Sequence, residues 1–134
     1  MTKQVWINLP VLNAARSRAF YDALGFAAVE QYCSEHTACA RIDDRLYLML
    51  LEKNRFAEFT SKPVVDATCS TEVLICLGCD SRAEVDRLVR LASDNGGRTT
   101  TEAKDQDGMY GHGFEDPDGH IWELGYFTSP EIRS

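Results

Sequence analysis

The stretch that decides the fold is Phe114-Glu115-Asp116-Pro117-Asp118-Gly119-His120-Ile121-Trp122-Glu123-Leu124. Its centre predicts a tight turn, because proline fixes φ at about −65°, Asp116 can bond its own backbone and Gly119 accepts a positive φ. The two flanks are then antiparallel strands. Alternation along the second strand places Ile121, Glu123 and Gly125 on one face. Glu123 is therefore predicted either to be solvated or to point into a cavity.

Working outward from this hairpin, the order strand, helix, strand, strand, strand occurs twice along the chain. The first copy has predicted strands at residues 4–11, 27–33, 37–42 and 45–51, a helix from Asn13 to about Leu24, and a hairpin turn at Asp43-Asp44. The second copy has predicted strands at residues 71–79, 98–104, 109–115 and 120–127. Its helix begins at the capping box Ser81-Arg82-Ala83-Glu84, ends before Gly96-Gly97, and has a predicted buried stripe of Val85, Leu88, Val89 and Ala92.

The duplication predicts an α+β fold in which two βαβββ modules form a curved, barrel-like mixed sheet. The first module spans about residues 4–52, the linker about 53–70 and the second module about 71–127, within a single domain of residues 1–134. A linker of this length is long for a simple connection. A lone module would leave its sheet half covered, so pairing of the modules is expected.

Composition and charge limit the kinds of partner and the cellular location that are expected. The chain has 134 residues, 44% of them hydrophobic, a net charge of −7 and a pI near 4.9. Basic residues are scattered, which argues against nucleic acid or an anionic membrane as the main partner. No apolar run approaches the ~20 residues of a membrane span, and no signal-peptide core follows Lys3. A cytoplasmic protein is expected.

The five cysteines are Cys33, Cys39, Cys69, Cys76 and Cys79. An odd number in a chain without a recognisable secretion signal favours reduced thiols over a disulfide framework. Cys76 and Cys79 have the spacing of a redox or zinc pair, but positions three apart on a strand point to opposite faces. Both are therefore predicted to be small buried hydrophobic residues.

A family resemblance rests on three motifs at the two ends of the chain. The stretch GFEDPDGHIWEL resembles the closing hairpin of the vicinal oxygen chelate superfamily, which includes glyoxalase I, extradiol dioxygenases, fosfomycin-resistance enzymes and bleomycin-binding proteins. Asn8-Leu9-Pro10-Val11 and Ser17-Arg18-Ala19-Phe20-Tyr21, followed by Leu24-Gly25-Phe26, resemble its first strand and helix. The likeness is greatest to a bacterial glyoxalase-like branch whose members mostly lack an assigned reaction. It implies a site in a cavity formed by two modules, within one chain or across a homodimer.

The same resemblance locates four metal-ligand positions of the metal-dependent relatives, which fall on Trp6, Met49, Leu74 and Glu123. Only Glu123 can bind a divalent ion. A shift of two residues reaches Asn8 and Glu72, an oxygen-rich set without an imidazole. A catalytic site for a transition metal usually has three or more nitrogen, oxygen or sulfur ligands. The chain is expected to lack the usual metal site, and the alternative is a Zn, Ni, Fe or Mn ion bound in part by Glu123.

This assignment of strand faces predicts a candidate ligand-binding surface that is mostly apolar with a few polar anchors, as in small-molecule pockets. Its predicted residues are Trp6, Asn8, Tyr47, Met49, Glu72, Leu74, Cys76, Ile121 and Glu123. The alternative is a barrel filled by the same side chains. In the segment 108–114, glycines alternate with larger residues, so Tyr110, His112 and Phe114 share one face and the other is nearly bare. Tyr110 and His112 are candidates for ligand binding and, with Glu123, for catalysis, or they form an ordinary cross-strand ladder.

Three functions follow as hypotheses. The first is a glyoxalase- or dioxygenase-like protein of unassigned reaction that binds a small molecule in the sheet cavity without the usual metal. The second is an enzyme, either a divalent-metal-dependent lyase, isomerase or dioxygenase with Glu123 as a ligand, or a metal-independent one with Glu123 or Glu72 as the base. The third is a structural or regulatory dimer without a ligand.

Overall fold

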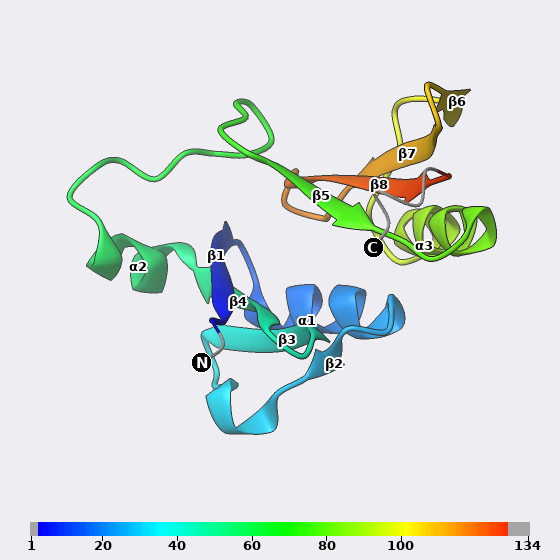
Figure 1. Ribbon diagram of the computed structural model, residues 1–134. Helices are drawn as coiled ribbons and strands as arrows, with labels where there is room; N and C mark the ends of the chain where they lie inside the picture. The colour runs from blue at the N-terminus through cyan, green and yellow to red at the C-terminus, as the bar shows by residue number, and fades with distance from the viewer. Residues whose placement is uncertain (1–2, 129–134) are drawn as a thin grey trace. The chain divides into compact units, whose positions relative to one another are not determined.

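The computed structural model describes residues 3–128 and divides into two compact units, the first ending at Asp66 and the second beginning at Ala67 (Figure 1). The first unit contains β1 (Val5–Val11), α1 (Ala14–Ala23), β2 (Ala27–Ala28), η1 (Glu30–Tyr32), β3 (Thr37–Asp43), β4 (Leu46–Glu52), α2 (Lys53–Phe56) and η2 (Ala57–Phe59). The second contains β5 (Leu74–Gly78), α3 (Arg82–Asp94), β6 (Lys104–Gln106), β7 (Met109–Glu115) and β8 (Ile121–Phe127). The predicted α+β class with two βαβββ modules is confirmed.

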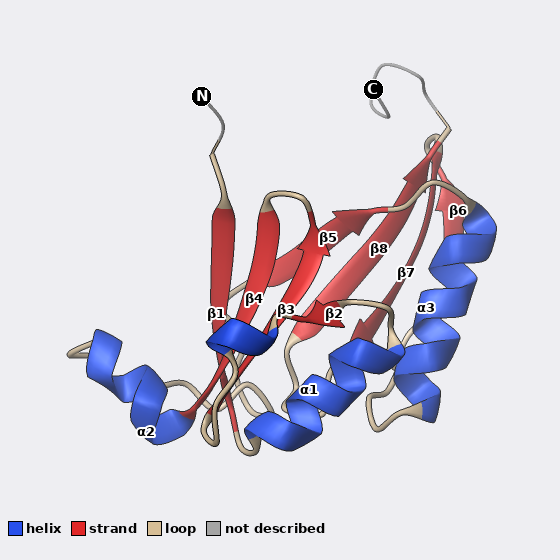
Figure 2. Cartoon of the chain, turned by 90° about the horizontal axis from the view of Figure 1, so that it is seen from below, coloured by secondary structure: helices blue, strands red, loops and turns tan. Residues whose placement is uncertain are grey.

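The first unit is a four-stranded mixed sheet in the order β1-β4-β3-β2, with β1 and β4 parallel. Helix α1 packs on β3 and β4, and Figure 2 shows it crossing one face of these strands. The side chain of Asn13 caps it, accepting a hydrogen bond from the Arg16 N–H, and Gly25 follows with a φ of 93°. Both ends agree with the predicted helix, because an Asn cap and a glycine with positive φ are standard terminators.

The second unit repeats this plan, in the strand order β5-β8-β7-β6, with β5 and β8 parallel. Ser81 caps α3 by accepting from the Glu84 N–H, and the buried residues of the helix are Val85, Leu88, Val89 and Ala92, as predicted. The helix packs on β7 and β8 (Figure 2). Trp122, fully buried, stacks on Phe114 with ring centroids 6.1 Å apart. The core of the unit therefore lies between α3 and one face of the sheet.

The decisive hairpin joins β7 to β8 as the sequence predicts. The Asp116 side chain accepts hydrogen bonds from the N–H groups of Asp118 (3.0 Å) and His120 (2.9 Å). Gly119 has a φ of 92°, and a Cβ there would lie 2.6 Å from the carbonyl oxygen of Ala67. Glycine is thus required at this position both by backbone conformation and by space.

Four predicted elements were wrong in extent. The strand at 71–79 is shorter because β5 pairs only with β8, and Leu74 lies opposite Ile121, the first residue of β8 after the hairpin turn. The strand at 98–104 is reduced to a bridge at Arg98 and to β6, because the Thr99 hydroxyl donates to the Gly113 carbonyl (2.7 Å) in place of a backbone donor. The strand at 27–33 ends after Ala28 and continues as the 3-10 turn η1. The first hairpin turns at residues 44–45, one residue later than expected.

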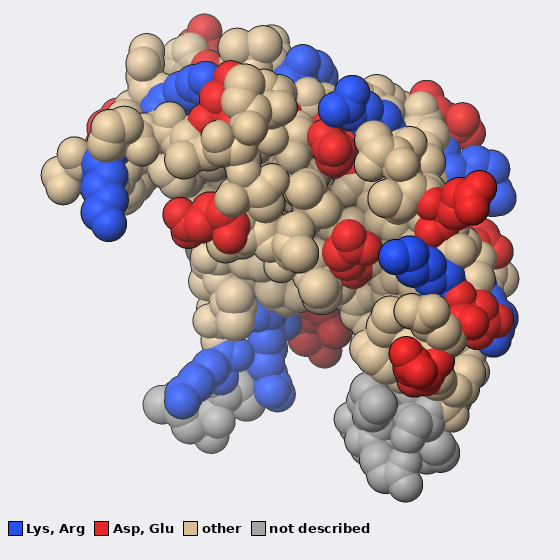
Figure 3. All heavy atoms as spheres, turned by 90° about the horizontal axis from the view of Figure 1, so that it is seen from above, with Lys and Arg blue, Asp and Glu red and all other residues tan. Residues whose placement is uncertain are grey.

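The boundary between the units falls inside the predicted linker at 53–70, which carries the short helices α2 and η2. The terminal residues of the predicted domain, 1–2 and 129–134, lie outside the described residues. No helix within residues 3–128 is long and apolar enough to cross a membrane. On the face drawn in Figure 3, acidic and basic side chains are intermingled rather than gathered by sign.

Candidate functional site

A groove of about 460 Å³ lies on the face of the second sheet that is turned away from α3. The register puts Cys76, Gly113 and Glu123 side by side on β5, β7 and β8. The lining is largely apolar, with the Glu123 carboxylate and the Cys76 thiol on the floor and two charged residues, Glu102 and Lys104, at the β6 edge. Its residues are Cys76, Leu77, Gly78, Thr101, Glu102, Lys104, Met109, Gly111, His112, Gly113, Glu123, Leu124, Gly125 and Phe127.

Glycines make the floor of this groove. At Gly113, a Cβ would lie 2.8 Å from Oε2 of Glu123 and 2.8 Å from the Trp122 carbonyl oxygen, so the Glu123 carboxylate lies directly over the bare backbone. At Gly125 the nearest atom to a Cβ would be Sδ of Met109, at 3.4 Å. Any larger side chain at these positions would fill the groove or displace the carboxylate.

Four predicted site residues of the second unit do not line this groove. Leu74 is 56% exposed on the edge strand β5, its register partner Ile121 lies beyond the groove on β8, and Glu72 is exposed in the segment before β5. Tyr110 is the fourth.

The cysteine prediction was half right. Cys79 is buried, and burial raises its pKa to about 11, whereas Cys76 is exposed in the groove opposite Glu123.

Tyr110 lies on the opposite side of the sheet from Glu123, because it pairs with Tyr126 while Glu123 pairs with Gly113. Its hydroxyl donates to Asp86 on α3, and the Arg82 guanidinium lies 4.9 Å from its ring centroid. The hydrogen bond to Asp86 raises the pKa of Tyr110. The structure does not bring Tyr110 together with the groove.

His112 lines the groove, but alternation along β7 directs its side chain away from the Glu123 face. Its Nε2 lies 2.8 Å from the Thr101 carbonyl oxygen and 3.2 Å from the Thr99 hydroxyl. Because that hydroxyl donates to the Gly113 carbonyl, it accepts from His112, and the proton is assigned to Nε2. His112 therefore holds the segment that supplies Thr101 to the groove wall.

The corresponding face of the first sheet is covered by aromatic side chains. Trp6 stacks on Tyr47 with centroids 4.2 Å apart, and Tyr32 meets Trp6 edge-on at 5.6 Å. Asn8 and Met49 are register partners next to them, and the Asn8 amide donates to the Trp6 carbonyl (3.1 Å). The four predicted residues of this unit thus share one surface.

The residues at the four positions of the metal-dependent relatives do not fit a transition-metal site. Trp6 is engaged in the aromatic stack, Met49 offers only a thioether, Leu74 has no donor and Glu123 supplies one carboxylate. Within residues 3–128, no three side chains of His, Cys, Asp or Glu are grouped as metal ligands. A catalytic zinc, nickel or iron ion needs at least three such donors in one place.

The sequence analysis missed Met109, Phe127 and Lys104 as groove residues. The signal for Met109 and Phe127 was present, because both alternate in step with the glycines on their strands. Lys104 had no such signal, because residues 98–104 do not form the continuous strand that was predicted and Lys104 is instead the first residue of β6.

Comparison with known proteins agrees with this architecture. The model of the Glyoxalase/Bleomycin resistance protein/Dioxygenase superfamily matches residues 3–124. The chain belongs to this superfamily. No curated protein matches this chain in sequence.

Solved structures of the same fold include both enzymes and resistance proteins. A hypothetical protein from S. aureus is 29% identical, with a TM-score of 0.80 over 94% of this chain and 95% of that one. A glyoxalase-related enzyme from Fulvimarina pelagi is 20% identical, with a TM-score of 0.79 over 94% and 88%. A bleomycin resistance determinant encoded on the transposon Tn5 is 23% identical, with a TM-score of 0.65 over 96% and 100%. The last two likenesses establish the fold alone.

Proposed function

We propose that this superfamily member binds a small, largely apolar molecule in the glycine-floored groove of its second unit, without the metal ion of the metal-dependent relatives. The observation that carries the proposal is the Glu123 carboxylate lying over Gly113 in a groove of about 460 Å³. Pockets of this size, apolar with a few polar anchors, are typical of small-molecule sites. The reaction, if the ligand is a substrate, stays unassigned.

The groove defines a ligand class. The Met109 thioether and the Phe127 ring can pack against an aromatic ligand. Because Gly111, Gly113 and Gly125 have no side chains, a flat ring can approach the backbone closely. Glu123 is an acceptor when ionised, so the ligand should present an N–H or O–H donor to it. An aromatic amine or phenol combines both properties.

A fluorescence titration with N-phenylnaphthylamine, an apolar amine, tests the proposal on the whole chain. Gly125→Leu should abolish saturable binding, because its side chain would occupy the groove floor beside Met109. Glu123→Gln should weaken binding about fivefold, since an amide replaces a charge-assisted hydrogen bond with a neutral one. Glu72→Gln, a neighbouring carboxylate outside the groove, is the matched control and should bind as wild type.

Unchanged binding in Gly125→Leu would place the probe elsewhere and overturn the proposal. The metal-free part has its own test, elemental analysis of protein purified without chelators and then exposed to Zn²⁺, Ni²⁺, Fe²⁺ and Mn²⁺. About one ion per subunit that disappears in Glu123→Gln would favour the metalloenzyme instead.

We also propose a homodimer located in the cytoplasm. Exposed apolar side chains lie on or beside the sheet-edge strands β1 and β5, namely Val5 (54%), Val73 (51%) and Leu74 (56%). Exposed sheet edges with apolar side chains favour pairing with another chain. Sedimentation equilibrium should give twice the chain mass, and Leu74→Lys should weaken the dimer if β5 takes part. A monomer at all concentrations would refute the dimer.

A further inference from the structure

Three glycines lie side by side across the second sheet. Gly78, Gly125 and Gly111 are register partners on β5, β8 and β7, and Lys104 follows on β6. Because register partners point to the same face of a sheet, three neighbouring strands contribute no side chain here. Strands lie about 4.8 Å apart, so this glycine row is about 10 Å long, and the next residues on the same face lie about 7 Å away on either side. The groove therefore contains an elongated strip of bare backbone.

The two long edges of the glycine row differ in chemistry. Cys76 and Glu123, two positions before the glycines of β5 and β8, lie along one edge. Met109 and Phe127, which are register partners, lie along the other. All four residues line the groove. A molecule placed along the row would thus meet a hydrogen-bond acceptor on one long edge and apolar side chains on the other.

The side chain of Met109 covers two of the three glycines. A Cβ on Gly111 would lie 3.1 Å from its Cε, and a Cβ on Gly125 would lie 3.4 Å from its Sδ. A Cβ on Gly78 would meet nothing within 4 Å, so the β5 end of the row is open. Methionine has three rotatable side-chain bonds and a polarisable sulfur that packs well on aromatic rings. Met109 can therefore leave the backbone and lie on a bound ring instead.

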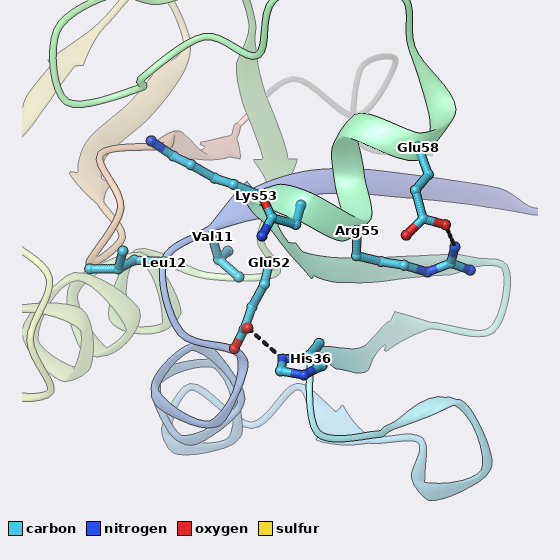
Figure 4. Close-up of a pocket in the computed structure, with 8 residues that line it drawn as sticks. Val11, Leu12, His36, Glu52, Lys53, Arg55 and Glu58 are labelled. Atoms are coloured by element: carbon cyan, nitrogen blue, oxygen red, sulfur yellow. Dashed lines mark hydrogen bonds and ion pairs between the residues drawn. The ribbon is translucent and has the colours of Figure 1, made fainter.

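The Glu123 carboxylate is open to a ligand, in contrast to the carboxylate of a pocket of about 350 Å³ in the first unit (Figure 4). In that pocket, Oε2 of Glu52 accepts from the Ala14 N–H at 2.9 Å and Oε1 lies 2.8 Å from Nδ1 of His36. No hydrogen bond or ion pair of Glu123 occurs within residues 3–128. Both oxygens of Glu52 thus have donors within the protein, whereas a donor for Glu123 can come from a molecule on the glycine row.

We propose that the glycine row binds a flat molecule of two fused aromatic rings that bears a hydroxyl or amino group on one long edge. This inference rests on the proposed function and narrows its ligand class. The rings lie against the backbone of all three glycines, and their hydroxyl or amino group donates to Glu123. The Met109 thioether moves from the glycines onto the outer face of the rings. A molecule with its donor at one end of the rings loses the hydrogen bond to Glu123.

Isothermal titration of the whole chain with 1-naphthol and 2-naphthol tests the position of the donor, because the two isomers have the same rings. 1-Naphthol carries its hydroxyl on a long edge and should bind about tenfold more tightly than 2-naphthol, whose hydroxyl lies near one end. Glu123→Gln should remove most of this preference. Glu72→Gln, a carboxylate outside the groove, is the matched control and should keep it.

Gly78→Ala tests the length of the row. The new methyl group meets open space in the protein, so the fold should be unaffected, but the methyl group would lift one ring off the backbone. The affinity for 1-naphthol should fall about fivefold, since close contacts of one ring are lost. The affinity for phenol should not change, because a single ring fits over Gly111 and Gly125 beside Glu123.

Met109 gives a spectroscopic readout. The chain has three methionines, Met1, Met49 and Met109. In protein with ¹³C-labelled methionine methyl groups, the Met109 signal should move upfield on addition of 1-naphthol, because an aromatic ring shields a methyl group on its face. The signal of Met49, which belongs to the first unit, should not move. Met109→Leu assigns the Met109 signal by removing it.

Equal affinities for the two naphthols would overturn this inference, and so would a Met109 signal that does not move at saturation. In both cases, loss of binding in Gly125→Leu would show that the ligand still occupies the groove, and the proposed function would stand. Binding of both naphthols that survives Gly125→Leu would refute the inference and the proposed function together.

Discussion

The two units have the same fold, but the sheet face turned away from the helix carries different side chains in each. In the first unit this face carries the stack of Trp6 and Tyr47, and in the second it carries Gly113 under the carboxylate of Glu123. The helix-facing sides are similar, with Leu48 buried in one unit and Trp122 in the other. The core under the helix therefore stabilises both units, while the other face is free to differ in function.

The largest effect should come from comparing the two tryptophans. Trp122→Ala should lower the free energy of unfolding by about 3–5 kcal/mol, because a fully buried ring that stacks on Phe114 leaves a cavity. Trp6→Ala should cost clearly less, since Trp6 is only half-buried and borders solvent. Urea unfolding followed by circular dichroism measures both. Equal losses would mean that the aromatic stack of the first unit is a second core rather than a surface.

The second prediction compares cysteines on the same two faces. Burial raises the pKa of Cys39 to about 11 from 9.0, so its thiolate fraction at neutral pH falls about a hundredfold. Cys76 is exposed in the groove. Iodoacetamide at pH 7.5 should therefore modify the exposed Cys76 much faster than the buried Cys39, as measured by peptide mass spectrometry. Both should react alike in urea, and similar rates in the folded protein would contradict the burial of Cys39.

The sequence predicted the backbone plan better than the surfaces. Asn13, Ser81 and Gly119 act locally, through caps and a positive φ, so the ends of both helices and the hairpin could be predicted from neighbouring residues. Alternation likewise placed Glu123 and Gly125 on one face. The strand predicted at 98–104 failed because a side chain, Thr99, takes the acceptor that a backbone N–H would use.

The candidate site was harder to predict, because it depends on contacts distant in sequence. Tyr110 was a candidate because of its residue type and its place among the glycines of β7. Its hydroxyl instead donates to Asp86, which is 24 residues away in the sequence. Cys76 was predicted to be a small buried residue, although alternation also placed it on the candidate surface with Glu123, and in the structure it is exposed in the groove. The pair of His36 and Glu52 has no local signature at all.

The third prediction concerns the glycine floor. Gly113→Ala should cost about 1–3 kcal/mol of unfolding free energy, because the new Cβ would lie 2.8 Å from a backbone oxygen that cannot move aside. Gly125→Ala is the matched control and should cost less, since its nearest neighbour is the flexible Met109 side chain at 3.4 Å. Thermal unfolding of both variants measures the difference. If Gly113→Ala were neutral, the carboxylate of Glu123 would not lie over a bare backbone.

The smallest expected effect is electrostatic and belongs to the first unit. The pKa of His36 is raised above its ordinary 6.5, so its bond to Glu52 contributes stability that is complete below that value and is lost as the pH rises through the raised pKa. The pKa of Glu52 is lowered below its ordinary 4.5, so its contribution is complete above 4.5 and is lost as the pH falls through the lowered pKa. The stability difference between wild type and His36→Gln should therefore be greatest between pH 4.5 and 6.5 and should shrink toward pH 9.

The other charges around His36 are Glu35, Lys53, Arg55 and Glu58, and they are common to both proteins in this comparison. Glu35→Gln is the control, because Glu35 lies 3.9 Å from Nε2 and is largely exposed, so its effect should be smaller at every pH. Urea midpoints at pH 5.5, 7 and 9 measure all three proteins. A difference that is constant with pH would show that protonation of His36 adds nothing to its interaction with Glu52.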